Sequence, residues 1–225
     1  DSVLRRPIPF PGAERLMVVW ETDRVSGTTR EPGSWPDYLD LAAESRAMVS
    51  MAALTGMESS FTPSRGAPQR LSTMAATHGY FPLVGVGTLH GRLFSAADDA
   101  PGAAPVVVLG ERFWRARFNG DASIIGTTIR LDDAPRQVVG IVPAGADFSL
   151  DQIHARAAYH GAYSGVGDVD AWIPLQASEK DYPRDTHPFF MVGRLADNAS
   201  RATSSEELGR IADAVKRFVK RSIAA

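Results

Sequence analysis

Two adjacent carboxylates, Asp98 and Asp99, form one of the few pairs in this sequence that could transfer protons in a reaction. Such a pair needs a concave, partly dry setting that drives the two pKa values apart. These residues stand in a stretch that also contains Pro101 and Gly102, and the side chains of adjacent residues tend to diverge. We therefore expect them to cap a helix or lie in a solvated loop, not to catalyse a reaction.

A second group of possible ligands is concentrated between residues 154 and 170. It comprises two histidines, two tyrosines and two aspartates, namely His154, Tyr159, His160, Tyr163, Asp168 and Asp170. Histidines that bind a metal from one helix usually stand four residues apart, so that both face the ion. The two histidines here are six apart, and the region has no helical period. The pattern allows a weak site for a divalent ion or ligand, but we favour an exposed loop.

Sequence motifs for covalent catalysis and phosphate binding are missing. No G-x-S-x-G nucleophile elbow occurs in the sequence. Three glycines, Gly85, Gly87 and Gly91, lack the spacing and the lysine of a phosphate-binding loop, so we interpret them as turn residues. We therefore predict no catalytic, cofactor-binding or metal-binding residue, and no cofactor.

The hydrophobic pattern predicts the strands that would hold these residues. Residues 105–109 form a continuous apolar run, which is typical of a strand buried on both faces. Residues 48–62 predict two strands separated at Gly56, and residues 127–142 predict a hairpin with a turn from Asp132 to Pro135. Further strands are predicted at residues 16–21, 69–77, 171–175 and 189–195. Residues 22–33 are polar and read as a loop.

Helices are predicted in four places by apolar spacing and capping residues. Ser34 can cap a helix over residues 34–45, because its hydroxyl can accept a backbone N–H of the first turn. A short helix is predicted at residues 79–84, and a long final helix starts at Ser204 or Ser205 and ends near residue 221. The helix over residues 111–118 carries one aromatic face, which is more often the core side of a helix than a ligand platform: Phe113, Trp114 and Phe118.

Composition limits the classes of protein that this chain can represent. Of its 225 residues, 24 are basic and 26 acidic, so there is no electrostatic reason to expect nucleic acid as a partner. Cysteine is absent, which excludes disulfides and thiolate zinc sites. No apolar run reaches the 18 residues expected of a membrane-spanning helix. The chain opens at Asp1 without a methionine or signal peptide, so we expect a piece of a longer protein.

The order of several short motifs resembles one known family. They run from G-Y-F-x-L-x-G-V and G-R-L-F, through A-P-V-V-V-L-G, to F-W-R-A-R-F-N-G-D, I-I-G and V-V-G-I-V-P, all within residues 79–143. Together they resemble the MacB-like periplasmic core domain of ABC transporter permeases, of the acidobacterial-type orphan and FtsX-like permease class. R-R-P-I-P-F-P-G-A-E-R-L near the start, S-W-P-D-Y-L-D-L, D-A-W-I-P-L and V-G-R-L extend the likeness. Residues 148–169 show no pattern of the family.

This resemblance implies an α+β fold with two lobes. A porter-like α/β lobe would be built from both chain ends, residues 1–77 and 176–225, with a strand-rich lobe inserted at residues 78–175. The recurrence of strand-helix-strand order at both ends agrees with this division. The domain would lie outside the inner membrane, in the periplasm or extracytoplasmic space, between two transmembrane helices.

The resemblance also implies a function and partners. We expect a non-catalytic module that couples transmembrane motion, driven by a cytoplasmic ATPase, to export of an unknown substrate or to a periplasmic partner protein. The full-length permease would act as a dimer, while the isolated fragment could be monomeric. The alternative is a free-standing binding protein for a small ligand, using residues 148–170, and a hydrolase is a third hypothesis.

Overall fold

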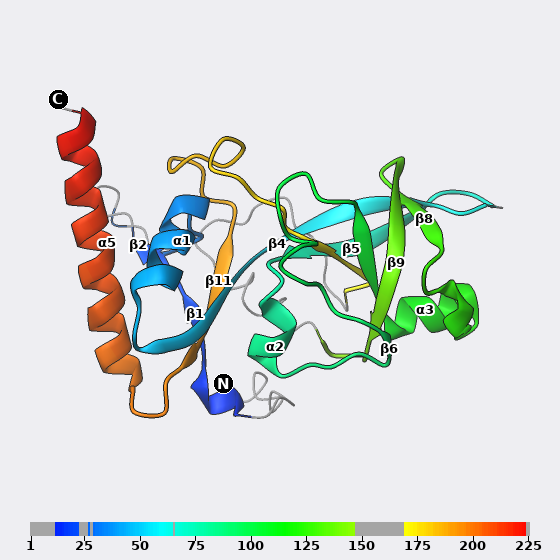
Figure 1. The fold of residues 1–225 in the computed structure, drawn as a ribbon, viewed down its shortest axis with the longest axis horizontal. Helices are drawn as coiled ribbons and strands as arrows, with labels where there is room; N and C mark the ends of the chain where they lie inside the picture. Colours follow the sequence, from blue (N-terminus) through cyan, green and yellow to red (C-terminus); the bar gives the residue numbers. More distant parts are fainter. Residues whose placement is uncertain (1–11, 23–26, 28, 65, 147–168, 224–225) are drawn as a thin grey trace.

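One long strand, β4 (Met48–Thr62), crosses the centre of the molecule and connects its two ends (Figure 1). The computed structural model describes residues 12–22, 27, 29–64, 66–146 and 169–223, with residues 216–223 described by their main chain only. The prediction of two strands around Gly56 is wrong. Gly56 pairs with Met74 of β5 (Gln69–Ala76), and this ladder continues without interruption from Leu54 to Phe61. Continuous pairing holds the glycine extended although glycine weakens a strand.

Six strands close into a ring at one end of the molecule. β4 pairs with β5, and the ring returns to β4 because Phe61 and Thr62 pair with β8 (Thr128–Leu131). Closure of this kind removes exposed strand edges. The other members, in order from β5 to β8, are β10 (Ala171–Pro174), β7 (Val106–Gly110) and β9 (Ala134–Val142). Two of the pairings, β10 with β5 and β7 with β9, are parallel, so the sheet is mixed.

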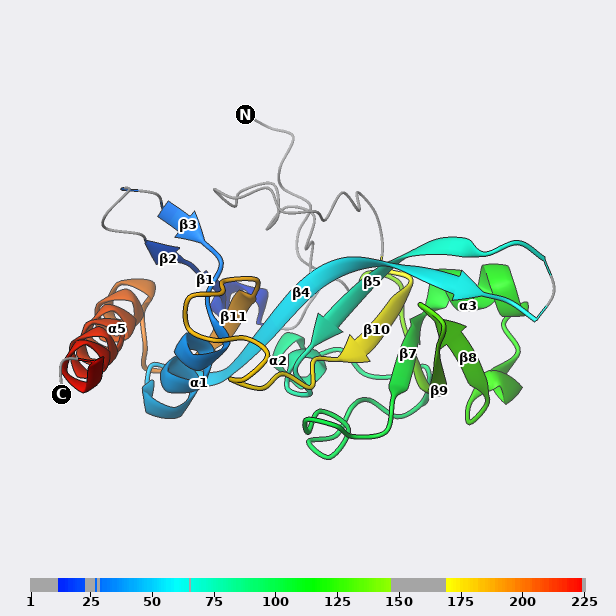
Figure 2. The ribbon, with the colours of Figure 1, turned by 90° about the horizontal axis from the view of Figure 1, so that it is seen from above.

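Both ends of the chain build the opposite end of the molecule. There β4 pairs with β11 (Phe190–Leu195), and β11 pairs with β1 (Leu16–Val19). The helices α1 (Trp35–Glu44) and α5 (Arg201–Ile223) lie side by side against this part of the sheet (Figures 1 and 2). A small second sheet pairs β2 (Glu21–Thr22) with β3 (Thr29–Glu31). Thr22 and β3 lie in the stretch that was predicted to be a loop, so that prediction is wrong there. The α+β class predicted from the sequence is confirmed.

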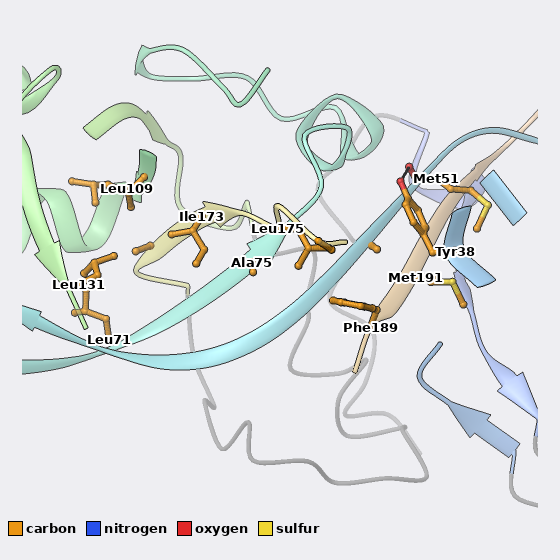
Figure 3. Close-up of a cluster of buried hydrophobic side chains, with 14 of the residues drawn as sticks. Tyr38, Met51, Leu71, Ala75, Leu109, Leu131, Ile173, Leu175, Phe189 and Met191 are labelled. Atoms are coloured by element: carbon orange, nitrogen blue, oxygen red, sulfur yellow. Dashed lines mark hydrogen bonds between the residues drawn. The ribbon is translucent and has the colours of Figure 1, made fainter. Parts of the chain in front are cut away.

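Alternating side chains divide the core between the two faces of the sheet. One cluster runs from the interior of the ring to α1 and α5, and Figure 3 shows its members from Leu109 and Leu131 to Tyr38 and Met191. The second cluster lies on the opposite face, where α2 (Tyr80–Val84) packs against Trp172. Because the first cluster is continuous, the ring and the helical end share one core. The predicted lobe boundaries at residues 77 and 175 stay a prediction.

Local hydrogen bonds explain where the helices begin. Ser34 caps α1 as predicted, because its hydroxyl accepts the N–H of Asp37 at 3.1 Å. The predicted start of the final helix at Ser204 or Ser205 is wrong, since α5 begins at Arg201. The hydroxyl of Ser200 accepts the N–H of Thr203 at 3.2 Å and supplies the cap three residues earlier.

The β8–β9 hairpin has a tighter turn than expected. Its central residues, Asp132 and Asp133, have φ values of 51° and 61°, as a two-residue turn of type I′ requires. Ala134 and Pro135 therefore belong to β9, where they pair with Leu131 and Arg130, and not to the predicted four-residue turn. In the described part of the chain, no helix is long and apolar enough to cross a membrane.

Candidate functional site

A groove of about 350 Å³ lies between α5, α1 and strand β1. Its walls are mainly apolar, because alternate residues of β1 face the two helices and each helix turns an apolar stripe toward the sheet. The side chains that form these walls include Met17, Val19, Leu41, Leu208 and Ile211. In Figure 2, α5 is seen nearly end-on beside α1 and β1. The helical end of the molecule thus contains a hollow large enough for a small ligand.

Carboxylates gather at one end of this groove. Asp37 lies in the first turn of α1 and Asp40 one turn further, and both accept hydrogen bonds from Arg184, at 2.8 Å in the case of Asp40. The hydroxyl of Ser34 also donates to Asp37, at 2.5 Å. Burial lowers the pKa of Arg184, but hydrogen bonds and attraction from Asp40 and Asp37 outweigh it and raise this pKa above its ordinary value. Arg184 therefore stays charged and orders this end of the groove.

A histidine and a further carboxylate complete the polar cluster. Nε2 of His187 lies 3.7 Å from a carboxylate oxygen of Glu21. Possible ligand atoms of Glu21, Asp37 and His187 all lie within 4.8 Å of one another, a spacing that could hold a divalent ion. No pattern in the sequence indicates this group, because residues so distant along the chain show no ligand spacing. The carboxylate of Asp37 is already bound by Ser34 and Arg184, and the absence of a metal site stays a prediction.

Glu207 fastens the first half of α5 to the connection between α1 and β4. Its carboxylate accepts the N–H groups of Ala47 at 2.8 Å and Arg46 at 3.2 Å, and the hydroxyl of Ser45 at 2.8 Å. Burial raises the pKa of Glu207, but these hydrogen bonds lower it more, so the net pKa lies below the ordinary value. The helix is therefore joined to the sheet by a charged contact as well as by apolar packing.

The predicted pair Asp98 and Asp99 does not form a joint site. Asp98 accepts two hydrogen bonds from Arg92, at 2.6 and 2.9 Å, which hold its pKa well below the usual range. Asp99 accepts the backbone N–H groups of His78 at 2.8 Å and Gln176 at 2.9 Å. Both residues lie in a loop, as expected, and the residues on either side of them are exposed. Their own side chains are only 11% and 9% exposed, because each is held by hydrogen bonds. Each carboxylate instead anchors the loop to a different neighbour.

Most of the predicted histidine and tyrosine group lies outside the described residues. This applies to His154, Tyr159, His160, Tyr163 and Asp168. Asp170 is described, and its carboxylate accepts the N–H of Ser72 in β5 at 3.0 Å, while its carbonyl accepts the N–H of Gly110 at 2.8 Å. Burial raises the pKa of Asp170. The described contacts of Asp170 therefore connect strands of the ring.

The three glycines that were interpreted as turn residues have different environments. Gly85 ends α2 in a left-handed conformation with φ 77°. Gly91 also has a positive φ of 71°, and a Cβ atom there would lie 2.2 Å from the carbonyl oxygen of Val139. Gly87 has neither a positive φ nor a neighbour within 4 Å of an added Cβ. The turn interpretation explains Gly85 but is wrong for Gly91, which lies in strand β6 (His90–Gly91), pairs with Gly140 of β9 and has no room for a Cβ atom. Nothing in the structure explains Gly87.

The aromatic face of α3 (Glu111–Phe118) lies on the core side, as predicted. Phe113 and Trp114 are each 4% exposed. The ring of Phe61 from β4 contacts Phe113 and Phe118 edge-on, with centroids 5.4 and 6.1 Å apart. These contacts stabilise the place where β4 and β8 close the ring.

Comparisons with known proteins agree with this architecture. A family model described as the MacB-like periplasmic core domain matches residues 4–211. The periplasmic region of MacB from Actinobacillus actinomycetemcomitans is similar in structure, with a TM-score of 0.64 and 14% identity over 93% of this chain and 92% of that one. The extracellular domain of the noncanonic ABC-type transporter YknZ from Gram-positive bacteria has a TM-score of 0.56 and 11% identity, over 87% and 90%. No curated protein matched the sequence.

Proposed function

This chain belongs to the family of MacB-like periplasmic core domains, and from that premise we propose that it transmits movement between an ABC permease and molecules outside the membrane. The chain is the periplasmic domain of a MacB-like ABC transporter permease. In the proposed assembly, transmembrane helices flank the domain and a cytoplasmic ATPase supplies the energy. The permease acts as a dimer through its membrane part, and a periplasmic protein or an exported substrate meets the domain on the outside.

The way in which both chain ends join one sheet supports this proposal. β1 pairs with β11, α5 follows β11 along the chain, and Glu207 binds α5 to the loop before β4. β4 then continues as one strand into the ring. A displacement of the chain ends would therefore reach the ring through hydrogen-bonded strands and a shared core. Packed elements of this kind move as rigid bodies and do not deform continuously.

The proposal includes no catalytic step. The family is one of transporter domains, and the carboxylates that sequence analysis considered for proton transfer each bind their own structural partners. The division into a lobe at residues 78–175 and a lobe from residues 1–77 and 176–225 is part of the proposal. The ring nevertheless uses β4 and β5 from before residue 78. For the alternative, a free-standing binding protein, the predicted site at residues 148–170 lies almost wholly outside the described residues.

The parent reading frame provides the first test. An apolar span of about 20 residues should stand directly before residue 1, since that length crosses a bilayer. A complete gene that begins with a signal peptide and stops near residue 225 would refute the permease assignment.

Cysteine labelling provides a test of location, because these 225 residues contain no cysteine. The unmodified full-length protein gives the background labelling of any cysteine outside them. Leu89 is 43% exposed, so Leu89→Cys in the full-length protein should react with a membrane-impermeant maleimide added to spheroplasts. Ala53 is fully buried, and Ala53→Cys serves as the matched control that should stay unlabelled. Labelling of Leu89→Cys only after lysis would contradict an extracytoplasmic position.

The coupling role needs the intact transporter. Glu207→Ala removes the charged contact between α5 and the loop before β4, so it should change the ATP turnover of the assembled transporter. Glu206→Ala, at the exposed neighbouring position, is the matched control. Equal turnover in both variants and in the wild type would argue against transmission through α5.

A further inference from the structure

The size and walls of the groove between α5, α1 and β1 suit a small organic molecule. Its volume of about 350 Å³ falls within the range of roughly 300–1,000 Å³ that is usual for small-molecule sites. The inner wall belongs to the core, with Leu41, Leu208 and Ile211 at most 8% exposed. An occupant would therefore bury an apolar body against these side chains.

The charges around this groove have one sign. In the described part of the chain, every charged side chain that lines it is a carboxylate: Glu21, Asp37, Asp40 and Asp213. Arg184 and His187 face the first three of these acids without lining the groove. Among the described residues, three carboxylates therefore face one guanidinium and one imidazole at this end of the groove. Such a field favours a cation and repels an anion.

A glycine keeps the groove open along α5. Gly209 lies in the interior of the helix, where glycine is less favourable than alanine. A Cβ atom at this position would have no neighbour within 4 Å, so no packing contact requires glycine there. The residue lines the groove, and its missing side chain leaves space beside Ser205 and Ala212. With glycine instead of alanine at this position, α5 is less stable where it lines the groove.

From these three observations we propose that the groove binds a small hydrophobic cation, an organic molecule with an apolar body and a protonated amine. The apolar body lies against the core side chains of α1 and α5. The ammonium group lies at the acidic end, where it donates hydrogen bonds to carboxylate oxygens of Glu21 and Asp40. A bare metal ion would contact the carboxylates but not the apolar walls. An organic acid would contact the apolar walls, but the carboxylates would repel its negative charge.

Three probes with the same body and different charges test this directly. They are 4-phenylbutylamine, 4-phenylbutanol and 4-phenylbutyrate, titrated calorimetrically at pH 7 into the complete 225-residue chain. The amine should bind roughly tenfold more tightly than the alcohol, because one partly exposed charge contact of this kind changes affinity by about that factor. The acid should bind more weakly than the alcohol. Equal affinities for the three, or a preference for the acid, would overturn the proposal.

Two variants localise the binding. Gly209→Leu adds a side chain to the groove wall and should abolish binding of both amine and alcohol, while leucine favours the helix and keeps the fold intact. Asp40→Asn should lower the affinity for the amine about threefold and leave that for the alcohol unchanged. Wild-type affinity in Gly209→Leu would show that the probe binds elsewhere.

A charge control separates the groove from the overall charge of the chain. Asp133→Asn removes one carboxylate from the β8–β9 turn, where asparagine also tolerates the positive φ. It should leave the affinity for the amine unchanged, and a loss equal to that of Asp40→Asn would contradict a local site. Zinc chloride is titrated in the same way. Binding of Zn²⁺ without binding of the amine would indicate a metal site and refute the proposal. The assay uses the isolated chain, so its outcome is independent of the proposed role in transport.

Discussion

At the scale of single residues, Asp98 illustrates how a carboxylate that suggests catalysis can serve a loop instead. Its oxygens accept two hydrogen bonds from Arg92, one from the N–H of Ser95 and one from the hydroxyl of the same serine. The four donors satisfy the carboxylate locally and favour its charged form. These hydrogen bonds hold the neighbouring loop in one conformation. Because they favour the carboxylate, Asp98 contributes to stability only while it is ionised.

This ionisation gives Asp98 a predictable dependence on pH. We expect Asp98→Asn to lower the free energy of unfolding at pH 7 by about 1–2 kcal/mol, since Arg92 is half exposed and its bonds are partly screened. The folded state lowers the pKa of Asp98, so its stabilisation is fully present above the unfolded value of about 3.9 and is lost as the pH falls below it. Urea unfolding at pH 7 and at about pH 3 would measure this.

The wild type and Asp98→Asn should therefore differ less in acid than at neutral pH. Asp133→Asn is a suitable control, because Asp133 is exposed in a turn and its loss should change stability by less than about 0.5 kcal/mol. A difference between wild type and Asp98→Asn that is the same at both pH values would show that the charge of Asp98 is not its contribution.

At the scale of elements, the acidic side chain of Glu207 adds hydrogen bonds to the apolar packing that holds α5. Glu207→Ala leaves the N–H groups of Arg46 and Ala47 without their acceptor, and we expect unfolding to become easier by about 1–2 kcal/mol. The amide of Ala47 should also exchange its hydrogen faster, because that N–H loses a 2.8 Å hydrogen bond. Thermal unfolding and hydrogen exchange would measure the two effects.

Glu206→Ala is the matched control for this prediction, since Glu206 is the adjacent acid on the exposed side of α5. It should leave both the unfolding temperature and the exchange at Ala47 unchanged. If the two variants behaved alike, apolar packing of Leu208 and Ile211 alone would hold the helix.

At the scale of the whole molecule, the ring and the helical end share a buried cluster that extends from Leu131 to Tyr38 (Figure 3). β4 pairs with β11 up to Leu54 and with β5 from Leu54 onward, so one strand belongs to both ends. A shared core and a shared strand couple the two ends energetically. We therefore expect them to unfold together.

Tryptophan fluorescence can test this cooperativity, because Trp35 lies in α1 and Trp114 in α3 at the other end. Two variants that each keep one of these residues, with the other tryptophans replaced by phenylalanine, report on the two ends separately. Each variant's fluorescence transition in urea should coincide with its own transition by circular dichroism, as a two-state reaction requires. A fluorescence midpoint that departs from the circular dichroism midpoint would mean that the two lobes unfold independently.

The sequence by itself determined the family, the α+β class and most of the local elements. Ser34 with Asp37 predicted the start of α1, and the apolar run at residues 105–109 predicted a buried strand. These features depend on residues close together in the sequence, because a helix cap and the period of apolar side chains both arise within a short stretch of chain. The aromatic face of α3 was predicted for the same reason.

Only the tertiary structure decided how distant segments meet. Possible ligand atoms of Glu21, Asp37 and His187 lie within 4.8 Å of one another, and Glu207 reaches the loop after α1, although no spacing along the chain relates these residues. Gly56 continues β4 because β5 pairs with it, which outweighs the local weakness of glycine. Long-range pairing and packing bring together residues that have no local relation in the sequence, and for that reason the groove and the closed ring were visible only in the fold.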